Sequence, residues 1–167
     1  MHRALFYLTL FTLGNLLLIS CQRRPDVQGQ GSALLQGIWI QDSVRNEEEL
    51  LAFTKHRFKI SCDSFYVDLT TYSKVNYYSD SCFQQGIWKE YAKGVYIVRS
   101  DSIFLDGTYT KANYKQKLGG CYHVGRYIKS FKIKEALPGS LLLESVDNQR
   151  ELRLKLESEI VCIPKEL

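Results

Sequence analysis

The sequence predicts an all-β domain, an antiparallel meander of about 8–10 strands that closes into a barrel and leaves room for one short helix. Two observations predict this fold. Apolar and polar residues alternate with a period of two in several segments, as they do in strands that bury one face. The chain also repeats a unit of three strands. Many antiparallel strands that share one apolar face tend to close, because closure removes exposed edges.

The alternation is clearest in the middle of the chain. Phe65, Val67 and Leu69 share one face of a strand, and Ile103 and Leu105 take the equivalent positions in a later strand. Near the end, three leucines alternate with charged residues. These faces predict the residues that line the barrel core.

Four short motifs recur in the same order, which indicates a repeated unit. Turns at Lys93-Gly94 and Asp101-Ser102 separate three strands in the second unit, and a third, degenerate unit starts at Gly125. Three units of three strands give about nine strands. The matched segments are Gln36–Trp39 with Gln85–Trp88, Asp63–Asp68 with Asp101–Asp106, Tyr72–Tyr77 with Tyr109–Tyr114, and Cys82–Trp88 with Cys121–Tyr127.

The first unit contains extra residues around Val44–Lys55. Asn46 followed by Glu49 is similar to a capping box, and apolar residues stand behind it. This pattern predicts a short helix that covers one mouth of the barrel. The alternative is a longer strand.

Residues 1–20 have the pattern of an export signal peptide, with a short positive start and an apolar run at 4–19. The last residues of the run, Leu18-Ile19-Ser20-Cys21, resemble a bacterial lipobox. That resemblance implies that cleavage leaves Cys21 as a lipidated N-terminus, carrying fatty acids such as palmitate. The alternative is a plain transmembrane anchor, but the apolar run is slightly shorter than the roughly 20 residues of a membrane span and contains Asn15.

The mature chain divides into two parts. Residues 21–33 are polar and include Gly and Ser, so we expect a flexible tether there, and residues 34–167 form the barrel domain. With Arg3 removed, 21 of the 22 Lys and Arg residues remain against 18 Asp and Glu residues. These charges are interspersed, which makes nucleic acid an unsuitable partner. The membrane, a small ligand and an envelope protein remain as partners, and the oligomeric state stays open.

Four cysteines follow Cys21, namely Cys62, Cys82, Cys121 and Cys162. An even number in an exported protein predicts two disulfides. None of the cysteines has CxxC spacing, so we expect neither a metal site nor a cofactor. A disulfide requires cysteines at the same end of the barrel. The nine-strand count then predicts Cys62–Cys121 at one end and Cys82–Cys162 at the other.

Gly37-x-Trp39, near the start of the first strand, resembles the motif of the lipocalin-like β-barrels, in which the glycine and tryptophan plug one end of the barrel. A second copy, Gly86-x-Trp88, departs from the single copy of that family. The mature chain, notably 76–127, also resembles small lipoproteins of Bacteroidetes-type bacteria. Such proteins sometimes carry the name fumarate hydratase, which this sequence does not support, since it lacks the signatures of both fumarase classes.

The residues after Cys21 imply a location within the envelope. Gln22 stands where enterobacterial lipoproteins retained in the inner membrane carry aspartate, which implies the outer membrane. Surface-export signals in lipoproteins of this kind are acidic, whereas Gln22-Arg23-Arg24 is basic. We therefore expect the domain to face the periplasm.

These observations favour a non-catalytic, lipid-anchored barrel that binds a small apolar ligand or an envelope component. One alternative is a protein-binding barrel similar to the periplasmic lysozyme inhibitors, and a less favoured one is an enzyme such as a hydro-lyase. A cavity lined by apolar side chains would support the carrier. A filled interior would support the protein-binding barrel, and a cleft with converging titratable groups would support the enzyme.

We assign no catalytic residue and no specific ligand-binding residue. The nine-strand count places Asp63 and Asp101 at opposite ends of the barrel, and it separates the tyrosine motifs Tyr72–Tyr77 and Tyr109–Tyr114 in the same way. We interpret both pairs as strand-end structure, in which Asp and Asn favour turns. His123 has no acidic or nucleophilic neighbour in the sequence.

Overall fold

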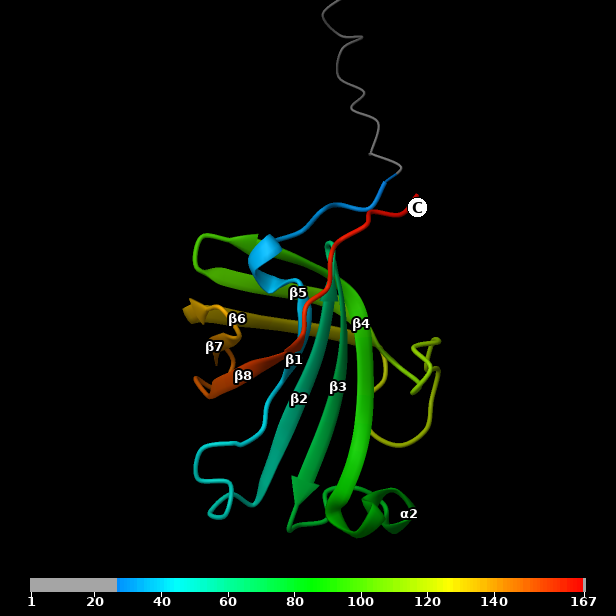
Figure 1. Cartoon of the computed structure of the whole chain (residues 1–167). Helices are drawn as coiled ribbons and strands as arrows, with labels where there is room; N and C mark the ends of the chain where they lie inside the picture. The colour runs from blue at the N-terminus through cyan, green and yellow to red at the C-terminus, as the bar shows by residue number, and fades with distance from the viewer. Residues whose placement is uncertain (1–26, 167) are drawn as a thin grey trace, which may run out of the picture.

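The computed structural model describes residues 27–166, so the signal peptide, Cys21 and the first part of the tether lie outside the described residues. Eight antiparallel strands follow one another around a closed barrel, and β1 pairs with β8 to complete it (Figure 1). The predicted meander barrel is therefore confirmed. The strands are β1 (Gly37–Ile40), β2 (Ala52–Ser61), β3 (Ser64–Ser73), β4 (Ile87–Arg99), β5 (Ser102–Thr110), β6 (Arg126–Leu137), β7 (Ser140–Ser145) and β8 (Glu151–Ser158).

The predicted turn at Lys93-Gly94 does not exist, and this reduces the expected nine strands to eight. Strand β4 runs without a break through both residues, and Gly94 pairs with Gly107 of β5. A Cβ atom at Gly94 would lie 2.2 Å from the carbonyl oxygen of Asp106. Gly94 therefore allows two strands to approach each other closely, which is a common role of glycine inside a strand.

The strand count determines which loops share an end of the barrel. The β2–β3, β4–β5 and β6–β7 turns lie at one end with both termini of the described chain, and we call this the closed end. The other four connections form the open end, where the short helix α2 (Asp80–Phe83) lies at the bottom of Figure 1.

The predicted disulfide pairing is wrong, although all four cysteines are bonded. Cys62 pairs with Cys162 at the closed end, and Cys82 pairs with Cys121 at the open end, with Cα–Cα distances of 4.8 and 5.5 Å. Only two strands, β4 and β5, separate Cys82 from Cys121 instead of the expected three. One strand fewer moves Cys121 and Cys162 to the ends opposite to those predicted.

The same correction applies to the other residues that were placed by strand count. Asp63 and Asp101 both lie at the closed end, and the two tyrosine motifs both lead into loops at the open end. Each aspartate nevertheless accepts a hydrogen bond from the hydroxyl of the serine that follows it, at 3.3 Å for Asp63 and 2.9 Å for Asp101.

The helix expected around 44–55 is also absent from the described chain. Asn46 adopts a positive φ of 54°, which interrupts a helical run, and turns occupy 45–49 before β2 begins. Glu47 accepts the hydrogen bond from the amide of Val44 and forms an ion pair with Lys55 at 3.1 Å. The acidic residues of this segment therefore stabilise a turn at the mouth of the barrel.

The inner faces predicted from the alternation are confirmed. Phe65 and Val67 are fully buried, and Leu69 is 7% exposed. Ile103 and Leu105 are also buried. The core continues along the other strands, with buried apolar residues on β1, β2, β4, β6, β7 and β8. This packed core lies toward the closed end.

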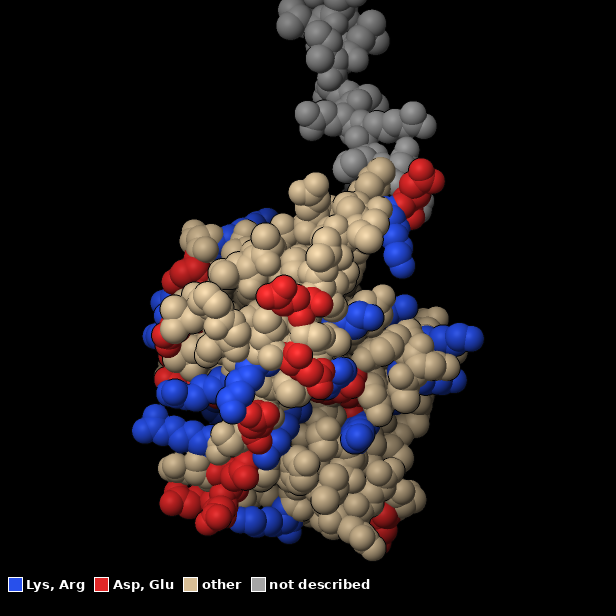
Figure 2. All heavy atoms as spheres, in the orientation of Figure 1, with Lys and Arg blue, Asp and Glu red and all other residues tan. Residues whose placement is uncertain are grey.

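The outer surface carries charges of both signs. In Figure 2, lysine and arginine side chains lie beside acidic ones over the face that is shown. Ion pairs such as Arg57–Glu157 at 2.7 Å and Lys155–Asp42 at 2.8 Å join neighbouring elements. In the part of the chain that the structure covers, no helix is both long and apolar enough to cross a bilayer.

Candidate ligand-binding cavity

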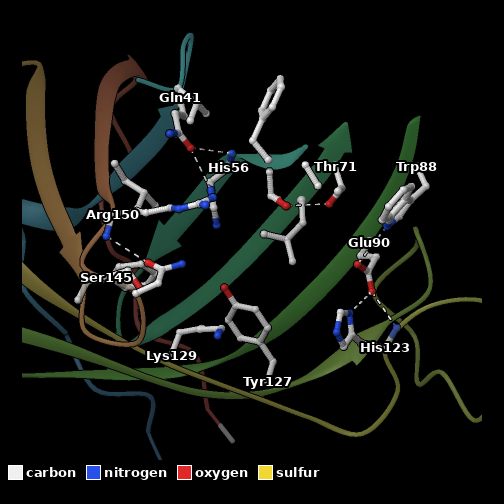
Figure 3. Close-up of a pocket in the computed structure, with 18 of the residues that line it drawn as sticks. Gln41, His56, Thr71, Trp88, Glu90, His123, Tyr127, Lys129, Ser145 and Arg150 are labelled. Atoms are coloured by element: carbon white, nitrogen blue, oxygen red, sulfur yellow. Dashed lines mark hydrogen bonds and ion pairs between the residues drawn. The ribbon is translucent and has the colours of Figure 1, made fainter. Parts of the chain in front are cut away.

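The open end of the barrel holds a cavity of about 390 Å³, within the size range of small-molecule sites (Figure 3). Residues from β2 to β8 line it, together with residues of the open-end loops. Its lining is mixed rather than apolar. Aromatic residues include Phe53, Tyr78, Trp88, Tyr109, Tyr127 and Phe131, and polar or charged residues include Gln41, His56, Thr71, Glu90, His123, Lys129, Ser145 and Arg150.

Strand alternation explains why polar side chains face the interior. On β4, Trp88 and Glu90 occupy the same inward row as Ala92 and Tyr96, which are buried closer to the closed end. Residues of an inward row follow each other at intervals of two. The row therefore places Trp88 and the polar Glu90 near the mouth and apolar residues in the core.

Glu90 is a buried carboxylate at one side of the cavity, with a side chain only 5% exposed. Its Oε1 atom accepts hydrogen bonds from the backbone N–H of His123 at 2.9 Å and from the ring Nδ1 at 2.8 Å (Figure 3). The indole N–H of Trp88 lies 3.4 Å from Oε2. A buried charge requires such partners, so Glu90 fixes the β5–β6 loop to the barrel wall.

Aromatic rings surround this carboxylate. Trp88 stacks on Tyr122 with ring centroids 5.2 Å apart, and Tyr78 meets both rings edge-on. Tyr109 stacks on His123 at 5.0 Å. Burial, followed by the charge of Glu90, raises the pKa of Tyr109 to about 12. The same two causes raise the pKa values of Tyr78 and Tyr122.

The Cys82–Cys121 disulfide links the two loops that carry these rings. Tyr122 follows Cys121 directly, and its hydroxyl donates a hydrogen bond to the carbonyl oxygen of Cys82. The β3–β4 and β5–β6 loops therefore form one cross-linked cover beside the cavity.

His56 lies on a different wall, with its ring held by Gln41. The side-chain oxygen of Gln41 lies 3.3 Å from the backbone N–H of His56 and 3.0 Å from its ring Nδ1. Because a backbone N–H can only donate, the shared atom is the acceptor and Nδ1 carries the proton. Burial, with a smaller effect from the charge of Lys129, lowers the pKa of His56 to about 4. His56 is thus neutral at pH 7, and its Nε2 atom is an acceptor.

Several polar groups that line the cavity have no hydrogen-bond partner among residues 27–166. Tyr127 is 2% exposed, and its hydroxyl points into the space between the labelled residues of Figure 3. Burial is the main cause that raises the pKa of Tyr127, so this hydroxyl keeps its proton. The oxygen of Gln41 is bonded to His56, but its NH₂ group and the Ser145 hydroxyl also lack a partner, in residues that are 6% and 7% exposed. Polar groups that face a cavity in this way normally bind water or a ligand.

The predicted motif residues lie at both ends of the barrel. Trp39 is buried at the closed end and donates from its indole N–H to the carbonyl oxygen of Leu35 at 2.9 Å. A Cβ atom at Gly37 would lie 2.5 Å from the side chain of Leu156. Gly86 and Trp88 lie at the open end, where Trp88 lines the cavity.

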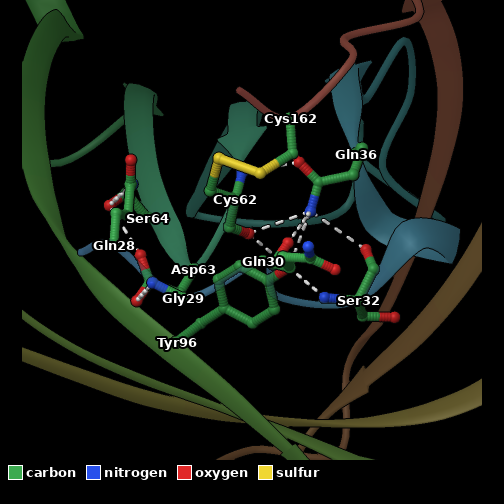
Figure 4. The surroundings of a disulfide bond; sticks show 10 residues. All are labelled: Gln28, Gly29, Gln30, Ser32, Gln36, Cys62, Asp63, Ser64, Tyr96 and Cys162. Atoms are coloured by element: carbon green, nitrogen blue, oxygen red, sulfur yellow. Dashed lines mark hydrogen bonds between the residues drawn. A yellow bond between two sulfur atoms is a disulfide. The ribbon is translucent and has the colours of Figure 1, made fainter. Parts of the chain in front are cut away.

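Polar side chains complete the closed end around the Cys62–Cys162 disulfide (Figure 4). The Gln36 amide donates to the carbonyl oxygen of Cys62 at 2.9 Å and accepts from its N–H at 2.6 Å. Tyr96 donates to the same carbonyl and accepts from the N–H of Ser32. These bonds close the barrel at this end.

Part of the expected tether lies on this end of the barrel. Val27 forms a β-bridge with Glu166, and the N–H of Gln28 donates to the carbonyl oxygen of Lys165 at 2.8 Å. The N–H of Gly29 donates to Asp63. Within 27–32, the expected tether is therefore held against the barrel by these contacts.

Sequence reasoning missed the pairing of His123 with Glu90, because the two residues are 33 positions apart. The available signal was Glu90 itself, a charged residue at an inward position two residues after Trp88. The tyrosine motifs behave as expected at their asparagines. Asn76 and Asn113 each accept a hydrogen bond from the backbone N–H two residues later, which is the Asx turn of a loop.

The chain matches no family model, no curated protein and no solved structure. Between residues 27 and 166, no cluster of three or more His, Cys, Asp or Glu side chains is arranged to hold a metal ion. The residues that line the cavity are therefore the basis for assigning a function.

Proposed function

We propose that this protein is a small-molecule-binding barrel of the cell envelope, anchored through lipidated Cys21, and that its ligand occupies the open-end cavity. The cavity of about 390 Å³ is the observation that carries this proposal. It is lined by aromatic rings and by hydrogen-bonding groups without protein partners, a combination typical of specific ligand sites.

The lining favours an amphipathic ligand over the wholly apolar one expected from the sequence. An apolar ligand would separate the Tyr127 hydroxyl and the Gln41 amide from water without replacing their hydrogen bonds, which costs free energy. A ligand with a ring and a polar group would stack on the aromatic wall and satisfy these groups. We therefore replace the apolar ligand by an amphipathic one.

Binding agrees better than catalysis with the state of Glu90. Its Oε1 atom already accepts two hydrogen bonds from His123, so this oxygen is not available as a general base. His56 donates its Nδ1 proton to Gln41 rather than to a nucleophile. Glu90 and His56 are thus engaged in holding a loop and a side chain in place.

A fluorescent probe tests whether the cavity binds small molecules. N-phenyl-1-naphthylamine is neutral and becomes fluorescent in apolar surroundings, and we expect it to bind the purified domain. Thr71 points into the cavity, whereas Thr70 is on the outer face of the same strand. We expect Thr71→Trp to weaken binding at least about tenfold by filling the cavity.

The matched control is Thr70→Trp, which adds the same ring outside the barrel and should leave the affinity unchanged. Equal binding by the wild type and Thr71→Trp would show that the probe sits elsewhere. An absence of binding to the wild type would contradict the proposed function and leave the protein-binding alternative in its place.

A further inference from the structure

We propose that the cavity is selective for small organic acids, whose carboxylate is held by Tyr127 and Lys129. This inference rests on the proposed function and adds the chemical class of the ligand. Three features support it. The polar groups without partners are hydrogen-bond donors, Lys129 places a positive charge in the same cavity, and the acidic side chains of the lining are bonded to other residues.

The unpartnered groups include three hydrogen-bond donors from separate elements. The Tyr127 hydroxyl belongs to β6, the Ser145 hydroxyl to the end of β7, and the Gln41 amide to the segment after β1. The oxygen of Gln41 is already used by His56, so only its NH₂ group remains free. A ligand rich in acceptor atoms satisfies all three, and a carboxylate has about four acceptor positions.

Lys129 adds a positive charge beside these donors. It lies two positions after Tyr127 on β6, so both side chains start from the same inner face of the strand, and both line the cavity. Lys129 and His56 line the same cavity, and after burial the charge of Lys129 is the second cause of the low pKa of His56. Lys129 forms an ion pair with Asp147 at 2.5 Å, which offsets part of its charge, but Asp147 is 51% exposed to water at the rim. Two N–H groups of Lys129 remain for a ligand.

The acidic groups of the cavity orient such a ligand. Glu90 is bonded to His123, and Glu151 forms an ion pair with Arg153 at 3.2 Å. The carboxylate of a ligand would avoid Glu90 and lie toward Lys129. Its apolar part would then contact Trp88 and Tyr109. Arg150 also lines the cavity and forms no ion pair with the described residues, so it adds positive potential at the mouth.

Charge selectivity follows from the strength of these bonds. Hydrogen bonds to an ionised group are roughly twice as strong as those between neutral groups. An acid should therefore bind more tightly than the amide of the same shape, although both present a carbonyl oxygen to Tyr127.

The test compares 1-naphthaleneacetate with 1-naphthaleneacetamide as competitors of N-phenyl-1-naphthylamine. We expect the acid to bind the wild-type protein at least about tenfold more tightly than the amide. Lys129→Met removes the charge and should bring this ratio close to one. Tyr127→Phe removes only the hydroxyl and should lower the ratio about threefold or more. The ratio is internal to each variant, so a change in overall stability does not affect it.

The matched control is Lys132→Met, the same substitution three residues later on β6, where the side chain is exposed beside Asp101. It should keep the wild-type ratio. The inference would be overturned if the wild type bound the acid and the amide equally well. It would also be overturned if both Lys129→Met and Tyr127→Phe kept the wild-type ratio. If the neutral probe binds but neither competitor displaces it, the preference for acids fails while the proposed function stands. If the probe itself does not bind, both fail.

Discussion

At the residue scale, the sequence predicted which side chains point inward but not which of them meet. The alternation identified Phe65, Val67 and Leu69 because a strand repeats every two residues. The bonds of His123 to Glu90 and of His56 to Gln41 join different elements, and their register depends on loop lengths. Local patterns contain no such information, and so the candidate site became visible only in the folded chain.

Because His56 is neutral in the fold, we expect the protein to lose stability as the pH falls. The pKa of His56 is about 4 in the fold, below its usual 6.5, so the unfolded chain binds more protons between these values. Stability is therefore unaffected above pH 6.5 and decreases as the pH falls toward 4. Between pH 7 and pH 4.5 this residue should reduce the free energy of unfolding by about 2 kcal/mol.

His56→Gln removes the titration and should remove that part of the pH dependence. Urea unfolding of both proteins at pH 7 and pH 4.5 measures the difference. The variant keeps every carboxylate, so the acid sensitivity of those groups cancels in the comparison. An identical decrease in both proteins would show that the ring of His56 is not neutralised by the fold.

At the element scale, one strand explains most of the incorrect predictions. A Lys-Gly pair between two alternating segments is typical of a turn, but Gly94 lies opposite Gly107 where two strands approach closely. Glycine serves both purposes, and the sequence does not distinguish them. Because each strand reverses direction, this one error exchanged the ends assigned to Cys121 and Cys162. The fold class did not depend on the exact count and was predicted correctly.

The two disulfides support different elements, and their removal should have different effects. Each closes a long segment, with sequence separations of 100 and 39, and each typically contributes about 2–4 kcal/mol. We expect the double variant Cys62→Ala, Cys162→Ala to unfold at lower urea concentration but to bind the neutral probe normally when folded. The variant Cys82→Ala, Cys121→Ala should also weaken probe binding, because it releases the loops that carry Tyr78 and Tyr122.

Urea unfolding and probe titration of both variants, with non-reducing peptide mapping of the wild type, test this prediction. Equal loss of affinity in the two variants would show that the closed and open ends are not independent. Peptides that link Cys62 to Cys121 would contradict the strand count itself.

At the scale of the whole molecule, the proposed anchor and the proposed binding cavity belong to opposite ends of the barrel. Val27 lies at the closed end beside Glu166, and five residues, 22–26, separate it from Cys21. The chain from Cys21 to Val27 therefore reaches at most roughly 20 Å. A lipid on Cys21 would therefore place the closed end toward the bilayer and the cavity mouth toward the periplasm, where a water-borne ligand can enter.

The anchor itself is tested by Cys21→Ala. We expect this variant to lose labelling by a fatty-acid probe and to move from the detergent fraction to the soluble fraction, because a triacylated cysteine holds a protein durably whereas a single chain does so only marginally. Gln22→Ala is the control and should be labelled like the wild type. Labelling that persists in Cys21→Ala would contradict the anchor, and release of the domain by protease treatment of intact cells would place it on the outer surface instead of in the periplasm.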